Sequence, residues 1–488
     1  MTPTTADVPS RGLAARLRTD ARSFAILGVT VFLAGILALG SRHAFSVSFW
    51  PANALMVGLV LRDRRLFSVA GWAGALFGFV GADLLFGRTL SLAAFFATAN
   101  LTGTFVAALL LRPLDLVDLR LRRAHSVLKI LIRLLPASFA AGACGAVLVV
   151  VEFHGSALQA LATWPASELV NYLTVLPAVL TLRGPIRLRA GGRLLGMSAL
   201  REAGPALFLA VSCLAAVLFD GPGSIVFPLP ALLLCALSYS IPTTCVMTML
   251  FGTTLLTLIG WNVIDLGQDM SLPQVVVSMR IAVAFLVIVP LTIGSAMAVR
   301  NDLLHRLRDA ADHDGLTGLL NRRAFEDRMG ERLLAGSGRL ILWLDIDRFK
   351  AINDRHGHQA GDAVLRAFAD TARNCCRSND LVGRIGGEEF ALILNVPDAQ
   401  AARTIAERLH ATFASSDFRW NGVSVHTTAS IGAAYLVRPV TDVNLLTRHL
   451  DEALYRAKRK GRNRIEWLDE DWDLTAGQPE QSLRIAAG

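Results

Sequence analysis

The order of hydrophobic and polar positions divides the chain into two unlike parts. As far as residue 299, apolar stretches follow one another with short polar connections, and each is roughly 17–25 residues long. A helix of that length spans the hydrocarbon core of a bilayer, so this part is predicted to be an all-α polytopic membrane bundle of about 8–10 helices. The predicted spans are residues 23–41, 46–61, 67–86, 91–111, 134–151, 157–181, 205–220, 224–240, 243–261 and 276–299.

The connections between these stretches alternate in charge. Arginines precede the first stretch and follow the second, the fourth and the sixth, whereas the intervening connections contain only Arg42 and Arg88. Because cytoplasmic loops are enriched in arginine and lysine, the N-terminus is predicted to be cytoplasmic, and an even number of spans returns the chain to the cytoplasm. Residues 1–22 are then a cytoplasmic tail and residues 23–299 a transmembrane domain.

Several polar residues lie within the apolar stretches: Asn53, Asp83, Asn100, Glu168, Asn171 and Arg280. A charged group in hydrocarbon is costly unless it is paired, so such side chains are expected to face the interior of a bundle. Two interpretations fit the sequence. The residues either form internal pairs that hold the helices together, or they line a pocket for a ligand or a transported substrate.

After residue 299 the pattern becomes that of a polar helix. Residues 300–313 carry apolar side chains at positions 303, 304, 307, 310 and 311, which form a narrow stripe on one helix face. The stripe either packs on the helix's own domain or forms a short dimeric stalk, and so short a segment favours neither. Residues 314–468 then mix helical and strand patterns as one α/β domain, and residues 469–488 are polar without periodicity, which predicts a disordered tail.

Two acids end a predicted central strand of the α/β domain. The apolar run RLILWLDI at 339–346 is typical of a strand that is buried on both faces. Asp345 and Asp347 lie where this strand reaches the edge of the sheet. They either cap the following helix or face a metal ion.

A predicted hairpin supplies more acids. The segments LVGRI and EEFALIL read as two strands, joined by a two-residue turn at Gly386 and Gly387. If this hairpin lies beside the central strand, Asp345 and Glu388 converge on one divalent cation, and Glu389 holds a second ion or shapes the first site. Adjacent acids at a turn repel each other, which favours a cation between them.

Composition agrees with a membrane protein and argues against a nucleic-acid-binding one. The chain is 53% hydrophobic, only 18% charged, and has a mean hydropathy of +0.48. Its net charge of +9 comes largely with arginines that flank apolar stretches, where lipid headgroups and topology account for them, so no nucleic-acid partner is expected. The six cysteines show neither a disulfide framework nor a zinc spacing, which fits a reducing compartment for the soluble part.

Residues 314–467 resemble the GGDEF diguanylate cyclases of bacteria. Six motifs occur in the family's order and spacing: DGLTGLLNRR, DIDRFKAIND, HGHQAGD, RIGGEEF, SIG and DEALYRAKRKGRN. The resemblance implies a palm-like α/β domain with a central, mainly antiparallel sheet. It also implies an enzyme that joins two GTP molecules into cyclic di-GMP, with release of two pyrophosphates, across a homodimer of cyclase domains.

The segment FWPANALMVGLVLRDRR at 49–65 resembles the start of the first class of bacterial membrane-associated sensor domains. This second resemblance implies a multi-pass protein of the bacterial inner membrane, with the cyclase domain in the cytoplasm and an unknown ligand controlling it. Two other functions stay open: a receptor that binds GTP or cyclic di-GMP without turnover, and a membrane part that transports a substrate.

The cyclase resemblance assigns roles to individual residues. Asp345, the Ile346 carbonyl and Glu388 would bind Mg²⁺, or Mn²⁺ in its place. Glu388 or a water would assist deprotonation of the attacking hydroxyl, and Glu389 would be the second catalytic residue. The substrate-binding residues would be Phe349, Lys350, Asn353, His358, Asp362, Lys458 and Arg462. Of these, Asn353 and Asp362 would read guanine, and the lysines and the arginine would contact phosphates.

A last motif points to feedback. Arg377 and Asp380 have the spacing of the family's product-inhibition site, and Arg408 has the position of a further arginine ligand. A guanidinium can stack on guanine while a carboxylate accepts from its edge, which suits cyclic di-GMP. The alternative is an ordinary surface ion pair.

Overall fold

The computed structural model describes residues 8–41, 49–182, 197–334, 338–377, 379–416, 418–420, 423–440 and 442–468. The chain divides into two compact units, here unit 1 (Met1–Leu303) and unit 2 (Leu304–Gly488), each with its own hydrophobic core. The predicted tail at 469–488, the start of the second predicted span and most of the arginine-rich connection after the sixth span lie outside the described residues.

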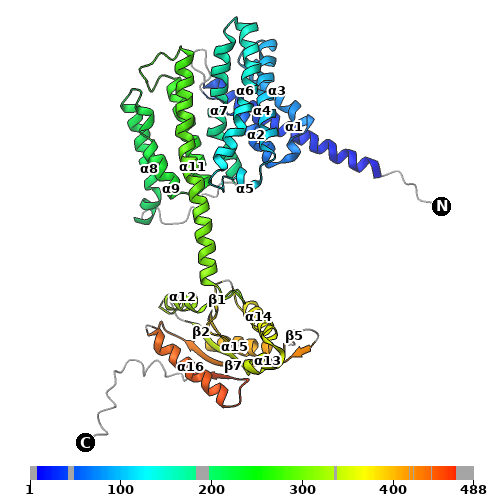
Figure 1. Cartoon of the computed structure of the whole chain (residues 1–488), viewed down its shortest axis with the longest axis vertical. Helices are drawn as coiled ribbons and strands as arrows, with labels where there is room; N and C mark the ends of the chain where they lie inside the picture. Colours follow the sequence, from blue (N-terminus) through cyan, green and yellow to red (C-terminus); the bar gives the residue numbers. More distant parts are fainter. Residues whose placement is uncertain are drawn as a thin grey trace, which may run out of the picture. The chain divides into compact units, whose positions relative to one another are not determined.

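Unit 1 is a bundle of helices, as predicted (Figure 1). Each of the ten predicted spans corresponds to a helix, and α5 is a short extra turn. The helices are α1 (Val8–Gly40), α2 (Ala52–Arg62), α3 (Val69–Leu85), α4 (Leu90–Leu111), α5 (Leu116–Leu119), α6 (Ser126–Phe153), α7 (Ala157–Thr181), α8 (Met197–Leu218), α9 (Leu229–Ser238), α10 (Ile241–Gly260) and α11 (Pro273–Asp312).

The helices differ in length more than the apolar pattern suggests. Among the described residues, five segments are long and apolar enough to cross a membrane: Arg16–Gly40, Leu90–Leu111, Ser126–Phe153, Ile241–Gly260 and Pro273–Asp312. By contrast α2 has 11 residues and α9 has 10, which at 1.5 Å per residue is about half of a bilayer's hydrocarbon core. A proline precedes each of these two helices at its N-cap, Pro51 and Pro228. α1 also begins well inside the segment predicted as a tail.

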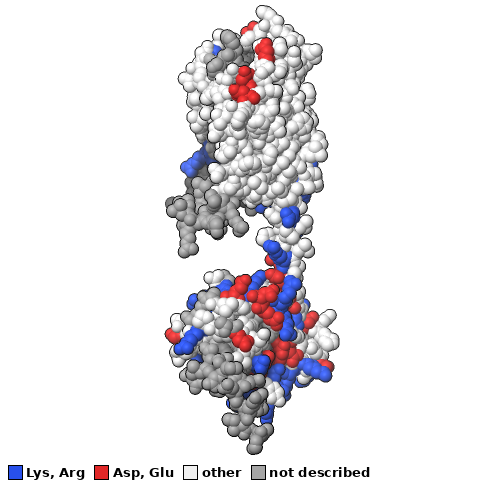
Figure 2. Space-filling model, turned by 90° about the vertical axis from the view of Figure 1, so that its left-hand side faces the viewer, with Lys and Arg blue, Asp and Glu red and all other residues white. Residues whose placement is uncertain are grey.

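Large apolar side chains cover the outside of unit 1. Leu37, Phe77 and Phe285 are more than 60% exposed. Figure 2 shows the same feature on one face, where unit 1 presents few charged residues. Such a surface is typical of helices that contact lipid.

Four of the six polar residues predicted in the spans gather inside the bundle. Asn53 on α2 donates from Nδ2 to Glu168 Oε1 at 2.8 Å and to Asn100 Oδ1 at 3.0 Å. Asn171, one turn beyond Glu168 on α7, accepts from the Trp50 N–H at 3.2 Å. Internal pairing therefore accounts for much of this set.

The other two polar residues also have charged neighbours. Asp83 pairs with Arg88 at 2.6 Å near the end of α3. Arg280 on α11 lies within electrostatic range of Glu168. The interior charges of unit 1 are thus arranged as attractive contacts between different helices or between neighbouring turns.

Unit 2 is a six-stranded mixed sheet with helices on both faces. The strands are β1 (Leu320–Asn321), β2 (Arg339–Ile346), β3 (Leu381–Arg384), β4 (Glu389–Asn395), β7 (Ala429–Leu436) and β8 (Ile465–Trp467), in the order β1-β3-β4-β2-β7-β8. Only the two edge pairs, β1–β3 and β7–β8, are parallel. The predicted central, mainly antiparallel sheet is confirmed. A separate hairpin joins β5 (Phe418–Trp420) and β6 (Val423–Val425).

Alternation along β2 explains the two helical layers. Leu342 and Leu344 belong to a core shared with α14 (His358–Cys375) and α15 (Ala399–Ala414). Ile341 and Trp343 belong to a second core shared with α12 (Arg322–Leu334) and α16 (Val443–Arg459). Because successive side chains point to opposite faces, one apolar strand supports both layers. α13 (Phe349–His356) follows β2 directly.

The apolar stripe near the end of α11 is not buried. Leu303, Leu304 and Leu307 are 53%, 37% and 65% exposed. The helix therefore does not cover its stripe by packing on its own unit, which was one of the two predictions. Its last turn is held within unit 2, where Asn321 Nδ2 donates to the Ala311 carbonyl at 2.6 Å.

Candidate functional site

The GGEEF segment forms the end of the β3–β4 hairpin. The Ile385 N–H donates to the Glu389 carbonyl at 2.9 Å, so these two residues are the last pair of the hairpin. Gly386, Gly387 and Glu388 form the turn, and the predicted two-residue turn is wrong. The Gly386 N–H also donates to the Glu389 carbonyl, at 3.3 Å, which folds the chain tightly. A Cβ on Gly386 would overlap the Glu389 carboxylate, so any larger residue there would require that side chain to move.

The end of β2 lies against this turn. Asp345 is directly opposite Glu389 in the β2–β4 register, and the Ile346 N–H donates to the Glu388 carbonyl at 3.2 Å. Residues opposite each other on neighbouring strands have Cβ atoms about 4.5–5.5 Å apart. The structure therefore brings Asp345, Ile346, Glu388 and Glu389 together at one edge of the sheet.

These acids destabilise one another's charged forms. Burial raises the pKa of Asp345, an ion pair with Lys458 lowers it, and the charges of Glu389 and Asp347 raise it, with a net upward shift. The pKa of Glu388 is also raised, first by burial and then by the charge of Asp345, with Lys458 opposing. A positive ion near Asp345 and Glu388 would stabilise the charged forms of both carboxylates.

The donor set fits Mg²⁺. Among the described residues no group of three or more His, Cys, Asp or Glu side chains is placed to hold a metal ion. Mg²⁺ does not need such a group, because it is usually held by one or two carboxylates, several waters and the phosphates of a substrate. Asp345 and Glu388, with raised pKa values and hard oxygen atoms, match that description.

Lys458 approaches the acids from α16, and Arg462 lies in the loop after that helix. Lys458 Nζ lies 2.7 Å from Asp345 Oδ2. Arg462 has a positive φ of 65°, in a loop that returns the chain to β8. The loop is held by Asp347, whose Oδ2 accepts from the Asn463 N–H at 3.0 Å. Lys458 thus borders the acidic edge, and Arg462 precedes the residue that Asp347 holds.

Asp347 is a structural residue in this arrangement. Its carboxylate accepts from Thr428 and Ser430 hydroxyls, at 2.6 Å each, besides the Asn463 N–H. A carboxylate with these partners has little capacity left for a metal ion. Of the two acids at the strand end, the hydrogen-bonded one holds the loop and the other, Asp345, faces the hairpin.

The predicted guanine-reading residues, Asn353 and Asp362, lie on two consecutive helices. Asn353 lies on α13, and its Oδ1 is buried without a hydrogen bond from any described residue. A Cβ on Gly361 of α14 would overlap this oxygen and come within 3.0 Å of the Phe349 ring. Asp362 follows Gly361 directly. The glycine therefore permits the close approach of Asn353 to the first turn of α14, next to Asp362 in the chain, which sequence reasoning did not identify.

The remaining predicted substrate residues lie nearby on the same helices. Lys350 and His358 are exposed near the N-terminal ends of α13 and α14. Phe349 is 8% exposed and packs into the core. Phe349 thus supports the packing of α13 and α14, while the exposed Lys350 and His358 side chains can reach a ligand.

Arg384 and Asp314 were missed by sequence reasoning. Arg384 donates from Nη2 to the Gly387 carbonyl at 2.6 Å, and its Nη1 contacts both Asp314 carboxylate oxygens, at 3.0 and 3.2 Å. Asp314 lies two residues after the end of α11. One guanidinium therefore ties the turn that carries Glu388 to the entry of unit 2. Both residues fall within quoted motifs, but their pairing needs the fold.

Arg377 and Asp380 share a turn without pairing their charges. Asp380 Oδ2 accepts from the Arg377 backbone N–H at 2.8 Å, and no salt bridge joins the two side chains in the described part of the chain. They line a polar cavity of about 540 Å³, together with Arg328, Arg332 and Arg373. Arg408 on α15 is not among the described residues that line it.

Comparisons with known proteins cover both units. The family model described as "Diguanylate cyclase, GGDEF domain" matches residues 311–464. The chain is similar to the "Probable diguanylate cyclase DgcF" of Escherichia coli O157:H7, with 31% identity over 467 residues, 93% of this chain and 95% of that protein. It is also similar to the protein of that name from Escherichia coli strain K12, with 34% identity over 316 residues, 63% of this chain and 98% of that protein.

A solved structure is similar to unit 2. The crystal structure of the coiled coil and GGDEF domain of DgcB from Caulobacter crescentus in complex with c-di-GMP shares 32% identity, with 35% of this chain and 92% of that chain covered and a TM-score of 0.33. The family assignment itself follows from the sequence matches, which extend over nearly the whole length of the relatives. This chain belongs to the family of GGDEF-domain diguanylate cyclases.

Proposed function

We propose that the protein is a membrane-bound diguanylate cyclase that condenses two GTP molecules into cyclic di-GMP and two pyrophosphates. The observation that carries the proposal is the hydrogen bond between Ile346 and Glu388, which seats the acidic turn on the end of β2 beside Asp345. Hard carboxylate oxygens beside the Lys458 ammonium group suit a nucleotide triphosphate and its metal ion.

Each residue at the edge of the sheet has a distinct task in this proposal. Asp345, the Ile346 carbonyl and Glu388 would hold Mg²⁺, which would supply positive charge against the developing phosphate charge. Glu388, with Glu389 beside it, draws the proton from the attacking 3′-hydroxyl. Lys458 and Arg462 orient phosphates. Arg384 is a positioning residue, because it holds the Gly387 carbonyl and hence the turn.

Guanine selectivity is assigned to the α13–α14 pair. Asn353 and Asp362 present acceptors to the N1–H and N2–H₂ edge of guanine. The buried Asn353 Oδ1, which has no donor among the described residues, supports this role because a polar atom of that kind is costly until a ligand supplies a hydrogen. Adenine offers an acceptor at N1 and would be rejected.

The direct test is synthesis. Residues 300–488, which include the whole of unit 2, are incubated with GTP and Mg²⁺, and cyclic di-GMP and pyrophosphate are measured by chromatography. We expect two pyrophosphates for each cyclic dinucleotide. Binding of cyclic di-GMP without any synthesis, from the full chain as well, would support a receptor instead.

Product feedback is a second part of the proposal. The cavity beside Arg377 and Asp380 is polar, and an Arg377 guanidinium without a carboxylate partner among the described residues is available to stack on guanine. Arg377→Ala should raise the cyclic di-GMP concentration for half-inhibition at least tenfold, roughly the effect of 1.4 kcal/mol. Arg366→Ala, an exposed arginine on α14, is the matched control. Unchanged inhibition in Arg377→Ala would remove the feedback site.

Location and assembly complete the proposal. We place unit 1 in the bacterial inner membrane, with both ends of the chain in the cytoplasm, on the strength of its apolar helices and the alternation of arginines. Two chains then pair through their cyclase domains, and the exposed leucine stripe of α11 supports a dimeric stalk. Extraction of the full chain from membranes by alkaline carbonate would contradict the location.

A further inference from the structure

A basic cavity lies at one end of the bundle in unit 1. It has a volume of about 280 Å³ and is enclosed by the end of α2, the end of α4 and α5. Its polar lining consists of Arg64, Arg112 and Asp115, and the rest is apolar, including Phe67. The arginines belong to connections that the charge pattern places on the cytoplasmic side.

The two arginines are not neutralised by the part of the protein that the structure describes. Neither the Arg64 nor the Arg112 side chain makes a hydrogen bond or ion pair with a described residue. Arg112 lies over the Phe67 ring, 5.4 Å from its centroid. The acid in the lining is already paired, because Asp115 Oδ2 lies 2.8 Å from Arg123 Nη1. The cavity therefore carries an excess of positive charge beside an otherwise apolar lining.

We propose that this cavity binds the phosphate headgroup of an anionic phospholipid. The guanidinium groups of Arg64 and Arg112 can fork to phosphate oxygens, and the apolar lining suits the glycerol and the first acyl carbons. A cavity of this size is below the roughly 300–1,000 Å³ of small-molecule pockets, which favours a headgroup over a whole soluble ligand. The proposal rests on the placement of unit 1 in a bilayer.

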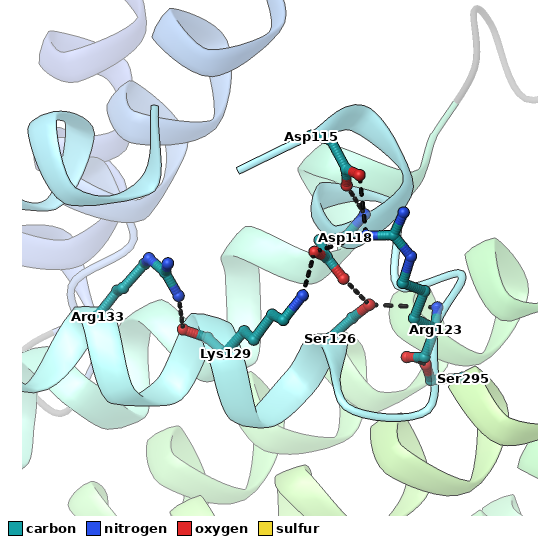
Figure 3. A network of polar contacts seen from close by, with 7 residues as sticks. All are labelled: Asp115, Asp118, Arg123, Ser126, Lys129, Arg133 and Ser295. Carbon is teal, nitrogen blue, oxygen red and sulfur yellow. Dashed lines mark hydrogen bonds and ion pairs between the residues drawn. The ribbon is translucent and has the colours of Figure 1, made fainter. Parts of the chain in front are cut away.

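The cavity wall is connected to a network of polar contacts, which Figure 3 shows. Arg123 Nη1 lies between Asp115 and Asp118, at 2.8 and 3.0 Å. Asp118 also accepts from Lys129 Nζ at 2.6 Å and from Ser126 Oγ at 2.9 Å. Burial alone would raise the pKa of Asp118, but these hydrogen bonds and the nearby positive charges bring it below the usual value.

The same network holds α11. Ser295 Oγ on α11 is within hydrogen-bond distance of two backbone carbonyls, Leu121 at 2.9 Å and Arg123 at 2.7 Å. Ser295 is fully buried. Arg123 thus contacts the cavity wall with its side chain and α11 with its carbonyl. A phosphate beside Asp115 changes the electrostatic potential at the Arg123 side chain. Headgroup binding is therefore coupled to the hydrogen bond between Arg123 and Ser295 on α11, the helix that leads to unit 2.

Native mass spectrometry of the full chain in detergent tests the lipid site. The probes are phosphatidylglycerol, phosphatidylcholine with the same acyl chains, and inorganic phosphate. We expect one phosphatidylglycerol to bind in preference to phosphatidylcholine, and Arg64→Gln/Arg112→Gln to weaken that binding about 30-fold, as expected for two arginines at a membrane surface. Arg120→Gln/Arg122→Gln removes the same charge from the α5–α6 connection, does not line the cavity and should bind normally.

The lipid-binding measurements distinguish the proposed site from its alternatives. Equal loss in both double variants would mean that total charge attracts the lipid and would overturn the site. Inorganic phosphate that binds with the same dependence on Arg64 and Arg112, and displaces phosphatidylglycerol, would assign the cavity to free phosphate instead. The single variant Arg64→Gln changes an exposed side chain and serves if the double variant fails to fold. No preference for phosphatidylglycerol in the folded wild type would also overturn the proposal.

The coupling is tested by cyclase rates in nanodiscs of phosphatidylglycerol and of phosphatidylcholine. This arm depends on the proposed cyclase activity, whereas the binding arm does not. We expect the ratio of the two rates to differ from one by at least threefold in the wild type and to approach one in Ser295→Ala, with lipid binding retained. Thr292→Ala, on the exposed face of α11, should behave as the wild type. Equal rates in both lipids would disprove the coupling while leaving the binding site intact.

Discussion

Glu168 in unit 1 and Asp345 in unit 2 are both 4% exposed, yet their surroundings differ. Glu168 accepts from the amide of Asn53, which also binds Asn100, and the charge of Arg280 lies within range. Asp345 faces Lys458 on one side and the repelling charges of Glu389 and Asp347 on the other. Glu168 has one amide donor and a cation within range, although its Oε2 has no hydrogen bond from a described residue, whereas Asp345 is crowded by acids.

The contrast teaches how to tell a structural acid from a functional one. Burial alone does not distinguish them, because both carboxylates are nearly inaccessible. The neighbours do: amide donors lower the energy of a charge within the fold, whereas clustered acids raise it until a cation is bound. Asp347 makes the same point within unit 2, since hydrogen bonds occupy its carboxylate although it is two residues from Asp345.

The largest expected effect is loss of synthesis in Glu388→Gln. The amide cannot hold Mg²⁺ or accept the proton of the 3′-hydroxyl, so the rate of cyclic di-GMP formation should fall at least about 1,000-fold. Chromatographic detection of product measures the rate, and circular dichroism checks the fold. Asp327→Asn, an exposed acid on α12, is the control and should be fully active. Retained synthesis in Glu388→Gln would refute the metal assignment.

The next effect concerns Gly361, where the guanine-reading helices approach each other. In Gly361→Ala the added Cβ displaces Asn353 Oδ1, and one guanine hydrogen bond is lost. The KM for GTP should rise about 10–100-fold with a smaller change in kcat, which steady-state kinetics measures. Gly330→Ala, on α12 with open space around the position, should leave both constants unchanged. A normal KM in Gly361→Ala would disconnect Asn353 from guanine.

Unit 1 should respond to loss of its acid through stability. Glu168→Ala leaves a buried Asn53 donor without this acceptor, so the full chain in detergent should lose roughly 1–3 kcal/mol of stability. Glu168→Gln keeps an acceptor and should lose less. Thermal unfolding followed by fluorescence gives the comparison, with Glu152→Ala on the surface of α6 as the control. An equal loss in all three variants would mean that Glu168 has no special structural role.

The smallest effect has the opposite sign. Because the pKa of Glu388 is raised in the folded protein, ionisation of Glu388 opposes folding as the pH rises through the normal acid range. Without Mg²⁺, Glu388→Gln should therefore melt about 2 °C higher at pH 7. The gain should disappear well below pH 4.5, the usual value for glutamate, where the acid is protonated in both states. A lower melting temperature of Glu388→Gln than of the wild type at pH 7 would show that the Glu388 carboxylate stabilises the fold. The contrast drawn between the acids of unit 1 and unit 2 would then fail.

Sequence patterns were most informative for features that depend on residues close to one another in the chain. The runs of apolar residues located each α-helix of unit 1 except α5, and the run at 339–346 located the central strand, because both depend on side chains that are close in the chain. The turn at Glu388 was misjudged, since Gly-Gly suits a two-residue turn, whereas the strand pairing ends at Ile385 and Glu389 and leaves three residues in the turn. The shortness of α2 and α9 was equally invisible in the apolar pattern.

What the sequence determined by itself is the division into an apolar helical unit and a mixed α/β unit, together with the motifs that name the chemistry of the second. Only the tertiary structure decided which acids face one another, that Arg384 ties Asp314 to the turn, and that Arg123 joins a basic cavity to Ser295 on α11. The physical reason is range. Propensity and hydrophobicity act between neighbours in the chain, whereas charge and hydrogen bonding act between neighbours in space, and those are brought together only by the packed fold.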